Sequence, residues 1–413
     1  MPLKFTYAPI VPPFAGAGQN EAVVAPYMAA LEGLGGARAA NPAAAEGVPF
    51  VYLVATGGTE SALMALYRQR EAMSPGEPVL IVAHPGNNSL PASLESLARL
   101  RQDGAPGRIV FLQSPDDPQG LDTLEAAVHD MEVRSRLHHS RIGLIGDPSD
   151  WLVASSPSAE TVRAMWGPEV VPIALESLTA AFEHITDDEV AAAAASLSEG
   201  AYDILEPNPA ELADVARVYI GLDRLVQEHR LDALTLRCFD LLLAKNTTGC
   251  FALSELTDRG IIAGCEGDLV STVGLMWARL VTGQVPWMAN PASVNTVENS
   301  LWLAHCTVPR TLIGDYRLRS HFESGIGVGI QGEIPTGPVT LARIGGAMMD
   351  ELWLAEGSIV QTGHAENLCR TQVEIVLSDG HVSDLLENPL GNHLILVRGH
   401  HAEHLSRWWE SML

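Results

Sequence analysis

One carboxylate and two imidazoles stand in sequence contexts that suit a divalent metal. Glu266 lies in a Gly-Cys-Glu-Gly-Asp stretch, His305 in Leu-Ala-His-Cys, and His393 in Gly-Asn-His. Carboxylate and imidazole ligands around open coordination positions suit manganese, iron, cobalt or zinc. A metal held in this way can bind two adjacent oxygens of a sugar and polarise its carbonyl group. A carboxylate beside it can move a proton between C2 and C1, so Glu266 is a candidate ligand, base or both.

The other reading of these residues is structural. A single histidine is more often an ordinary polar residue at the edge of a β domain than a ligand, so the metal hypothesis depends on the three residues together. The five cysteines are odd in number, widely spaced and without a Cys-x-x-Cys pair. This spacing argues against a disulfide scaffold and against structural zinc, and we expect buried free thiols.

The net charge of the chain limits the kinds of substrate or partner that such a metal site would serve. Lys and Arg number 25 against 50 Asp and Glu, a formal charge of -25. So acidic a surface repels phosphate backbones and anionic lipids, and we expect no nucleic-acid or membrane partner. A small neutral molecule or a cationic partner fits better. No apolar run reaches the ~20 residues of a membrane span. Met1 to Lys4 lack the apolar segment of a signal peptide, so we expect a cytoplasmic protein.

The first third of the chain alternates apolar strands with amphipathic helices. Strands are expected at Phe50–Ala55, Pro78–Ala83 and Arg108–Leu112, with helices at Ser61–Gln69 and Leu121–Leu137. This order predicts a parallel sheet covered on both faces. Ligands gather at the carboxyl ends of such strands. Thr59 and Glu60, in the turn after the first strand, are therefore candidate substrate contacts.

Beyond residue 140 the same alternation of strand and helix resumes. Thr186 and Glu189 form a capping box before an alanine-rich helix, and Asn208 followed by Pro209 opens a longer one. A strand is expected over Leu234–Phe239. At 413 residues the chain suggests two or three domains.

From about Val285 glycines and β-branched residues replace the helical periodicity, which predicts a mostly antiparallel, barrel-like β domain. We divide the chain into an N-terminal α/β domain over residues 1–139, a second α/β domain over 140–284 that carries Glu266, and a C-terminal β-barrel domain over 285–413 that carries His305 and His393. The glycine-rich segment Gly327–Gly332 matches a dinucleotide fingerprint. No helix is expected after it, so a glycine-rich β turn is the better interpretation, and we expect no nucleotide cofactor.

The chain resembles the L-fucose isomerase and L-arabinose isomerase superfamily, in particular its shorter fucose-isomerase-like members. The resemblance covers nearly the whole length and depends on segments that occur in a shared order. The stronger segments are Gly264–Leu269, Glu298–Cys306 and Gly391–His393. The supporting segments are Thr56–Glu60, Asn88–Ala92, Pro148–Leu152, His321–Gly325 and Leu368–Gln372.

This resemblance implies two Rossmann-like α/β domains, a C-terminal β-barrel domain and a metal-dependent aldose–ketose isomerase with a small-molecule sugar substrate. Members of the family use manganese (Mn2+), assemble as trimers or hexamers, and place the active site between subunits. By resemblance, Glu266 matches the metal-binding and catalytic glutamate, and His393 matches the late metal-binding histidine. His305 matches the additional histidine ligand of the arabinose isomerases. His321 and Glu323 are expected only to line the substrate pocket.

One position departs from the family pattern. Where the family has its second acidic metal ligand and base, this chain has Asn290. An amide oxygen can ligate a hard cation, but it cannot act as a base. Three outcomes stay open. Glu266 works alone, another carboxylate such as Glu323 fills the role, or the metal is bound weakly or not at all.

The last outcome would leave a sugar-binding or regulatory protein on the isomerase scaffold. Epimerisation or aldol cleavage is a further possibility for metal chemistry on the same scaffold. The low basic content disfavours a dedicated phosphate clamp, although one arginine such as Arg370 can still bind an anionic group of the substrate.

Overall fold

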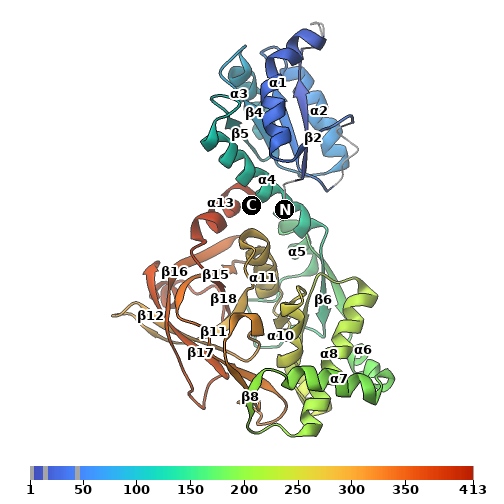
Figure 1. Cartoon of the computed structure of the whole chain (residues 1–413), viewed down its shortest axis with the longest axis vertical. Coiled ribbons are helices and arrows are strands. Elements are labelled where there is room, and N and C mark those ends of the chain that lie inside the picture. Colours follow the sequence, from blue (N-terminus) through green and yellow to red (C-terminus); the bar gives the residue numbers. More distant parts are fainter. Residues whose placement is uncertain (1–3, 13–16, 42–46, 413) are drawn as a thin grey trace. The chain divides into compact units, whose positions relative to one another are not determined.

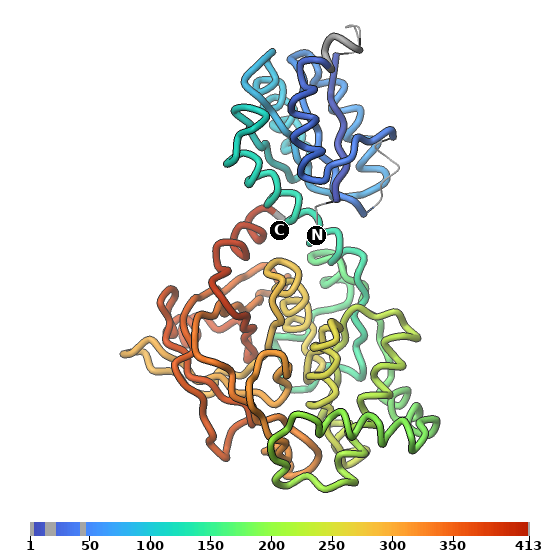
Figure 2. Tube along the Cα trace, in the orientation of Figure 1, coloured from blue at the N-terminus to red at the C-terminus, as the bar shows by residue number. Residues whose placement is uncertain are grey.

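A computed structural model of the chain describes residues 4–12, 17–41 and 47–412. Residues 1–3, part of the segment in which a signal peptide was sought, lie outside the described residues. The chain divides into two compact units (Figures 1 and 2). Unit 1 comprises Met1–Arg136 and Arg407–Leu413, and unit 2 comprises Leu137–Ser406.

Unit 1 contains a five-stranded sheet in the order β2-β1-β3-β4-β5, in which all neighbouring strands are parallel. Its strands are β1 (Phe5–Ile10), β2 (Gly36–Arg38), β3 (Phe50–Val54), β4 (Val79–Ala83) and β5 (Gly107–Phe111). Its helices are α1 (Ala17–Gly33), α2 (Glu60–Met73), α3 (Ser89–Gln102) and α4 (Pro118–His138). Every residue of β3 and β4 is buried, as continuous apolar runs predict for the centre of a parallel sheet.

The last residues of the chain pack within unit 1. Helix α13 spans Ala402–Met412. Arg407 pairs with the fully buried carboxylate of Asp130 on α4, and Trp408 Nε1 donates to the Asp130 carbonyl oxygen. The charge of Asp130 is also met by Arg108 on β5. The carboxyl end of the chain is thereby fixed to the first parallel sheet.

The α/β part of unit 2 contains a second parallel sheet in the order β10-β9-β6-β7. Its strands are β6 (Arg141–Ile145), β7 (Glu169–Ile173), β9 (Ala233–Leu236) and β10 (Ile262–Cys265). The helices are α5 (Ala159–Met165), α6 (Leu175–Ala181), α7 (Asp187–Ser198), α8 (Pro209–His229), α9 (Cys238–Lys245), α10 (Cys250–Asp258) and α11 (Leu269–Thr282), with a short 3-10 turn η2 (Phe182–His184).

The predicted capping box at Thr186 and the predicted helix start at Asn208 are confirmed. The Thr186 hydroxyl accepts from the Glu189 N–H at the start of α7, while Asn208 and Glu211 cap α8 in the same reciprocal way. The strand expected over Leu234–Phe239 is shorter than predicted. It ends at Leu236 because Arg237, at φ -72° and ψ 77°, leaves the extended conformation and α9 begins at Cys238.

The C-terminal part of unit 2 is a closed barrel in the order β11-β12-β17-β16-β15-β18, with all neighbours antiparallel. Its strands are β11 (Trp287–Asn295), β12 (Ser300–His305), β15 (Gly337–Gly345), β16 (Glu351–Thr362), β17 (Thr371–Asp379) and β18 (Leu394–Arg398). The short elements η3 (Arg310–Leu312) and α12 (Asp384–Glu387) lie between them. The α/β class with a C-terminal antiparallel barrel is thus confirmed.

The glycine-rich segment at Gly327–Gly332 contains a strand. Gly329–Gly332 forms β14, which pairs antiparallel with β13 (Tyr316–Arg319), and β13 pairs in parallel with β8 (Ala201–Ile204). Helix α11 is buried along most of its length and packs against β10 as well as β15 and β18 (Figure 2). This helix therefore joins the second sheet to the barrel. Among the described residues, no helix is both long and apolar enough to cross a membrane.

Candidate active site

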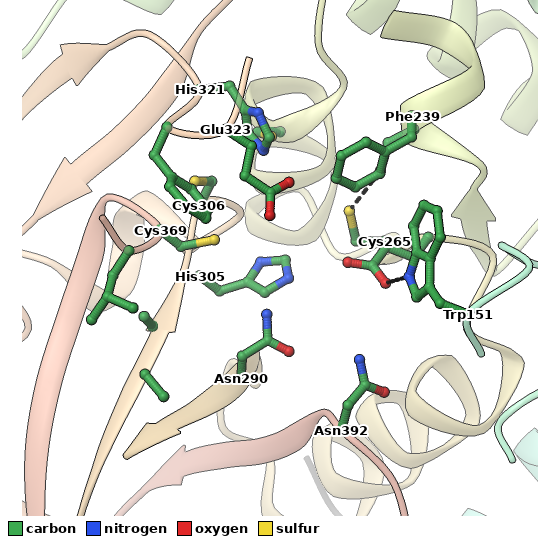
Figure 3. A pocket seen from close by; sticks show the side chains of 17 residues that line it. Trp151, Phe239, Cys265, Asn290, His305, Cys306, His321, Glu323, Cys369 and Asn392 are labelled. Atoms are coloured by element: carbon green, nitrogen blue, oxygen red, sulfur yellow. Dashed lines mark hydrogen bonds between the residues drawn. The ribbon is translucent and has the colours of Figure 1, made fainter. Parts of the chain in front are cut away.

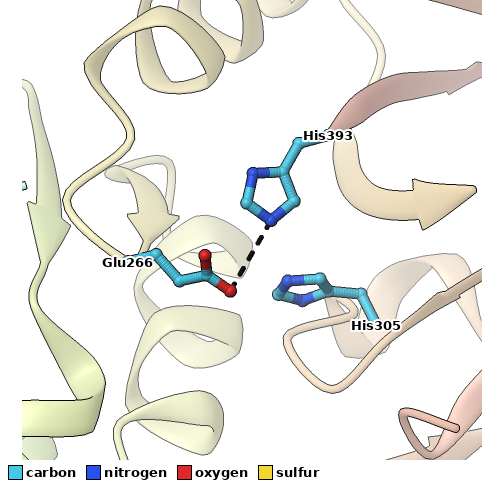
Figure 4. A group of neighbouring side chains, drawn as sticks. All are labelled: Glu266, His305 and His393. Atoms are coloured by element: carbon cyan, nitrogen blue, oxygen red, sulfur yellow. Dashed lines mark ion pairs between the residues drawn. The ribbon is translucent and has the colours of Figure 1, made fainter. Parts of the chain in front are cut away.

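Three distant segments bring Glu266, His305 and His393 together. Glu266 directly follows β10, His305 is the last residue of β12, and His393 directly precedes β18. One ligand atom from each lies within 4.8 Å of the others, and all three residues are buried (Figure 4). The structure therefore gathers the three residues that the sequence marks as candidate metal ligands.

Glu266 sits on a backbone turn that aims its carboxylate. It has φ +64° and Gly267 has φ +75°, so two consecutive residues adopt the left-handed conformation between β10 and α11. A side chain at position 267 would place its Cβ 2.7 Å from Pro148 Cα. A non-glycine residue with positive φ is uncommon and marks a constrained site. The turn lets Asp268 cap α11 by accepting from Ser271 N.

One ring nitrogen of His393 makes a hydrogen bond, and the other makes none among the described residues. Nδ1 lies 2.8 Å from Asp268 Oδ2. Nε2 is buried, has no hydrogen-bond partner, and lies 3.7 Å from Glu266 Oε1. Buried polar atoms are nearly always satisfied, and a metal-ligating histidine usually binds a carboxylate through its second nitrogen. The Nε2 atom is therefore positioned as the ligating nitrogen of a metal-bound histidine would be.

A buried network holds Asp268 behind His393. Arg343, on β15 and fully buried, lies 3.7 Å from the Asp268 carboxylate and donates to Ser271 Oγ and Ser155 Oγ. A Cβ at Gly391 would lie 2.1 Å from the Arg343 guanidinium. The glycine of the Gly-Asn-His motif is therefore required because Arg343 occupies the space of its side chain.

His305 is oriented by a simpler contact. Its Nδ1 lies 2.8 Å from Thr307 Oγ1, and its ring centroid lies 5.6 Å from that of His393. Burial, together with the charge of His393, lowers the pKa of His305 to about 4. The imidazole is therefore neutral near pH 7, which is the form that binds a metal.

The two carboxylates make this site favourable for positive charge. Burial acts to lower the pKa of His393, but the hydrogen bond to Asp268 and the charges of Asp268 and Glu266 outweigh it and raise this pKa to about 9. Burial acts to raise the pKa of Asp268, and His393 with Arg343 brings it down to about 2. The Glu266 pKa is also below its usual value, because His393 and Trp151 outweigh the effect of burial. A divalent cation would replace the proton on His393.

The ligand set fits such a cation. Metal–ligand bonds to nitrogen and oxygen are about 2.0–2.2 Å long, so two ligands of one ion lie at most about 4.4 Å apart. The 3.7 Å between His393 Nε2 and Glu266 Oε1 satisfies this limit. The three ligand atoms together lie within 4.8 Å of one another, so binding of one ion would draw the set slightly closer. One carboxylate with two imidazoles is a donor set for manganese, iron, cobalt or zinc.

Glu266 and His305 open onto a cavity of about 460 Å³. Asn290, His321 and Glu323 also line it, as do Trp151, Phe239 and Asn392 (Figure 3). Asn290 lies on β11 opposite Ala304, the residue before His305. The predicted site residues of unit 2 therefore meet around one cavity, with the fully buried His393 packed behind Glu266.

Thr59 and Glu60 belong to unit 1. Thr59 ends the turn between β3 and α2, and Glu60 is the first residue of α2. This turn lies beside the one that follows β4, because Gly57 N donates to Asn87 O. Thr59 is buried and its hydroxyl donates to Thr56 O. The predicted position at the carboxyl end of a central strand is correct, and contact with a substrate stays a prediction.

Sequence reasoning missed Trp151 as a residue of this site. Its Nε1–H donates to Glu266 Oε2 at 2.6 Å, and its ring meets that of Phe239 edge-on at 5.0 Å. Trp151 is 51% exposed, so it holds the carboxylate from the open side of the cavity. The segment Pro148–Leu152 pointed to this region, although it did not assign the contact.

The pocket lining among the described residues carries two glutamates and no lysine or arginine. The guanidinium of Arg370, a candidate for binding an anionic group, donates to Ser320 O and to Glu366. Arg319 also donates to Glu366. These two buried arginines are thus already paired with protein acceptors.

Comparison with known proteins gives distant relatives that carry one name. No protein-family model matches the chain. The sulfoquinovose isomerase of Priestia megaterium (strain ATCC 12872 / QMB1551) is 22% identical over 331 residues, which cover 77% of this chain and 73% of that protein. That of Alkalicoccus urumqiensis is 23% identical over 273 residues, 62% of this chain and 59% of the relative. That of Clostridium sp. (strain MSTE9) is 24% identical over 233 residues, 56% and 52% respectively.

The chain is therefore a distant homologue of proteins named as sugar isomerases. This agrees with the class of protein that the motifs indicate. The narrower resemblance to the fucose and arabinose isomerases stays a prediction.

Proposed function

We propose that the protein is a metal-dependent aldose–ketose isomerase of the fucose and arabinose isomerase type. The observation that carries this proposal is the buried Nε2 of His393, which makes no hydrogen bond among the described residues and faces Glu266 beside the sugar-sized cavity. The homology to proteins named as sugar isomerases supports it.

Glu266, His305 and His393 would hold the ion, for which we propose Mn2+ from the resemblance and the oxygen-and-nitrogen donor set. When bound, such an ion supplies Lewis-acid stabilisation of the negative charge that develops on the sugar oxygens. Asp268 fixes the ring of His393, and Trp151 fixes the carboxylate of Glu266. Asn290 offers an amide to the same cavity.

Proton transfer between C2 and C1 requires a carboxylate that Asn290 does not provide. The Oε2 atom of Glu266 accepts from Trp151, and its Oε1 faces His393. Glu323 follows β13, lines the same cavity, and directs its carboxylate into the open space beside His305 (Figure 3). We therefore assign the ligand role to Glu266 and the general-base role to Glu323.

Two matched variants test this division of roles. Glu266→Gln should lose both Mn2+ affinity and solvent-deuterium incorporation at C2 of the aldose. Glu323→Gln should keep the Mn2+ affinity and lose the exchange. Isothermal titration with Mn2+ and proton NMR in D2O measure the two properties separately. Undiminished exchange in Glu266→Gln would contradict the proposal, and undiminished exchange in Glu323→Gln would return the base to Glu266.

The substrate panel should begin with sulfoquinovose, the sugar in the relatives' name, and include L-fucose, L-arabinose and other neutral aldoses. A sulfonate is a permanent anion. The cavity lining described above offers it two carboxylates and no lysine or arginine side chain to pair with. This observation favours a neutral aldose. If sulfoquinovose were the one sugar of the panel that is converted, a positively charged side chain would have to reach the site from outside this cavity lining.

The resemblance also leads us to propose a homotrimer or homohexamer with the site near a subunit boundary. A second chain could supply the groups that this cavity lacks. Light scattering coupled to size-exclusion chromatography measures the assembly, and a monomer with full activity would contradict it.

A second candidate function is sugar binding without catalysis, which the amide of Asn290 at the position of a family carboxylate favours. Thermal-shift measurements across the same sugar panel, with and without Mn2+, separate the two. Sugar-dependent stabilisation that needs no metal and is accompanied by no turnover identifies a binding protein.

A further inference from the structure

All five cysteines of the chain line the cavity beside the metal ligands. They come from the starts of α9 and α10, the end of β10, the residue after β12 and the loop before β17. These residues are Cys238, Cys250, Cys265, Cys306 and Cys369. Free thiols that serve only as small apolar groups would be spread through both units. Their convergence around one cavity indicates a chemical role.

Two of these residues form a close pair, which we call the thiol pair. The Sγ atoms of Cys238 and Cys265 lie 3.2 Å apart. The register of the second sheet fixes this distance, because Cys265 is opposite Leu236 on the parallel strand β9 and Cys238 follows two residues later. The pair is therefore built on rigid elements.

We propose that the thiol pair is a redox modification site at which a peroxide forms a disulfide between Cys238 and Cys265. In the first step the thiolate of one cysteine attacks hydrogen peroxide, the O–O bond breaks, and the leaving hydroxide takes up the thiol proton, so that a sulfenic acid and water form. In the second step the other thiol attacks the sulfenic sulfur, the S–O bond breaks, and the disulfide and a second water form. Two sulfurs are oxidised and one peroxide is reduced.

Disulfide formation would alter the metal ligand next to it. The two sulfurs must move from 3.2 Å to about 2.05 Å. Cys265 is bonded directly to Glu266, whose left-handed backbone allows little adjustment. Metal ligands keep their distances to the ion within about 0.2 Å of the usual values, so a displaced carboxylate holds the ion less tightly. We therefore expect the disulfide to weaken Mn2+ binding. This effect on the metal rests on the proposed function, whereas formation of the disulfide does not depend on it.

A second set of thiols competes for oxidation. Cys306 interacts with both Cys250 and Cys369, and its Sγ accepts from Arg370 N. Its sulfur thus has several partners, whereas the sulfurs of the thiol pair face each other. The residues joined under oxidation distinguish the two sets.

The test uses the full chain, first fully reduced and then treated with one equivalent of hydrogen peroxide. Titration should show the loss of two of the five thiols, and mass spectrometry of unreduced peptides should join the Cys238 peptide to the Cys265 peptide. Dithiothreitol should restore both thiols. Calorimetry should show at least tenfold weaker Mn2+ binding to the oxidised than to the reduced chain.

Cys238→Ser and Cys369→Ser are the matched variants. Cys238→Ser should form no disulfide and should bind Mn2+ with the same affinity before and after peroxide. Cys369→Ser should still form the Cys238–Cys265 disulfide. A link that joins Cys306 to Cys250 or Cys369, or thiols oxidised without any link, would overturn the proposal. The peptide map decides this even if the chain binds no Mn2+ and isomerises no sugar, so the two proposals fail separately.

Discussion

His393 derives its chemistry from the residue behind it. Because Asp268 occupies Nδ1, only Nε2 faces Glu266 and His305. Arg343 in turn offsets the charge of Asp268 in a fully buried setting. At metal sites the ligating histidine recurrently binds a carboxylate through one ring nitrogen and turns the other nitrogen toward the ion. The site is thus specified by more residues than those that would touch the ion.

The variant Asp268→Asn tests this support. We expect Mn2+ affinity to fall about 10–100-fold, because the ring of His393 is no longer held by a carboxylate. We also expect the free energy of unfolding to fall by about 3–5 kcal/mol, because Arg343 is left buried without its counter-charge. Calorimetry well below the unfolding temperature measures the affinity.

The control for lost stability is Leu341→Ala, in the apolar core on the same strand as Arg343. This truncation should cost about 2–5 kcal/mol and leave the Mn2+ affinity unchanged. Equal losses of affinity in both variants would show that Asp268 acts only through stability.

At the scale of elements, the candidate ligands lie at the ends of β10, β12 and β18. The turns between elements set the directions of their side chains. Gly391, at φ +144°, precedes β18 and leaves room for Arg343. Gly283, at φ +69°, ends α11 with open space around its Cα. Both glycines have a positive φ, but only at Gly391 would a side chain also clash with a neighbour. Comparing them therefore separates the effect of backbone strain from that of steric conflict.

Gly391→Ala should disturb the site, whereas Gly283→Ala should only lower stability. The first adds a Cβ 2.1 Å from the guanidinium, so Arg343 or the His393 loop must move, and Mn2+ affinity should drop at least tenfold. The second costs about 1 kcal/mol for an alanine in the left-handed conformation. Urea unfolding and Mn2+ titration on both variants provide the comparison, and unaltered metal affinity in Gly391→Ala would contradict the account.

The capping box of α7 gives a pH-dependent prediction. Hydrogen bonds from Thr186, and then from Arg224, lower the pKa of Glu189 from 4.5 to about 2. The folded pKa is depressed, so the stabilisation is fully present above pH 4.5 and is lost as the pH falls through 2. The difference in unfolding free energy between the wild type and Glu189→Gln should therefore shrink over this interval.

Thr186→Ala should cost about 1 kcal/mol at neutral pH, the usual value for a lost N-cap. Asp188→Asn, which changes an exposed carboxylate in the same helical turn, is the control. A pH profile of Asp188→Asn that matches that of Glu189→Gln would show a general charge effect instead of a capping box.

The elements were more predictable than the contacts that complete the site. Continuous apolar runs identified β3 and β4, and the capping signals identified the starts of α7 and α8, because these patterns are local. The role of Trp151 depends on its meeting Glu266 across 115 positions. No local pattern reports such a meeting.

Asp268 and Arg343 left partial signals. An aspartate directly before an apolar helix is a typical N-cap, and an arginine inside the apolar strand β15 required a buried partner. The sequence could not show that these partners are each other. The gathering of the cysteines also depends on the register of the sheet and the closure of the barrel, which are tertiary properties.

For the whole molecule, metal should act as a stabilising ligand of unit 2. Mn2+ at 100 times its dissociation constant should raise the free energy of unfolding by about 2.7 kcal/mol, if the unfolded chain does not bind it. A chelator should reverse this stabilisation. Thermal unfolding with Mn2+, with chelator, and in the variant His393→Ala measures the effect. A shift of equal size in His393→Ala would place the binding elsewhere on this acidic chain.

The buried arginine of β15 has a consequence for the order of assembly. Its guanidinium reaches Ser155, 188 positions earlier, Ser271, 72 positions earlier, and the Leu390 carbonyl, 47 positions later. Contacts that span such separations form late, since long loops must close first. A growing chain on the ribosome therefore cannot present the metal ligands until synthesis has passed β18. An ion that binds at Glu266, His305 and His393 would therefore be captured only once these distant segments have folded together.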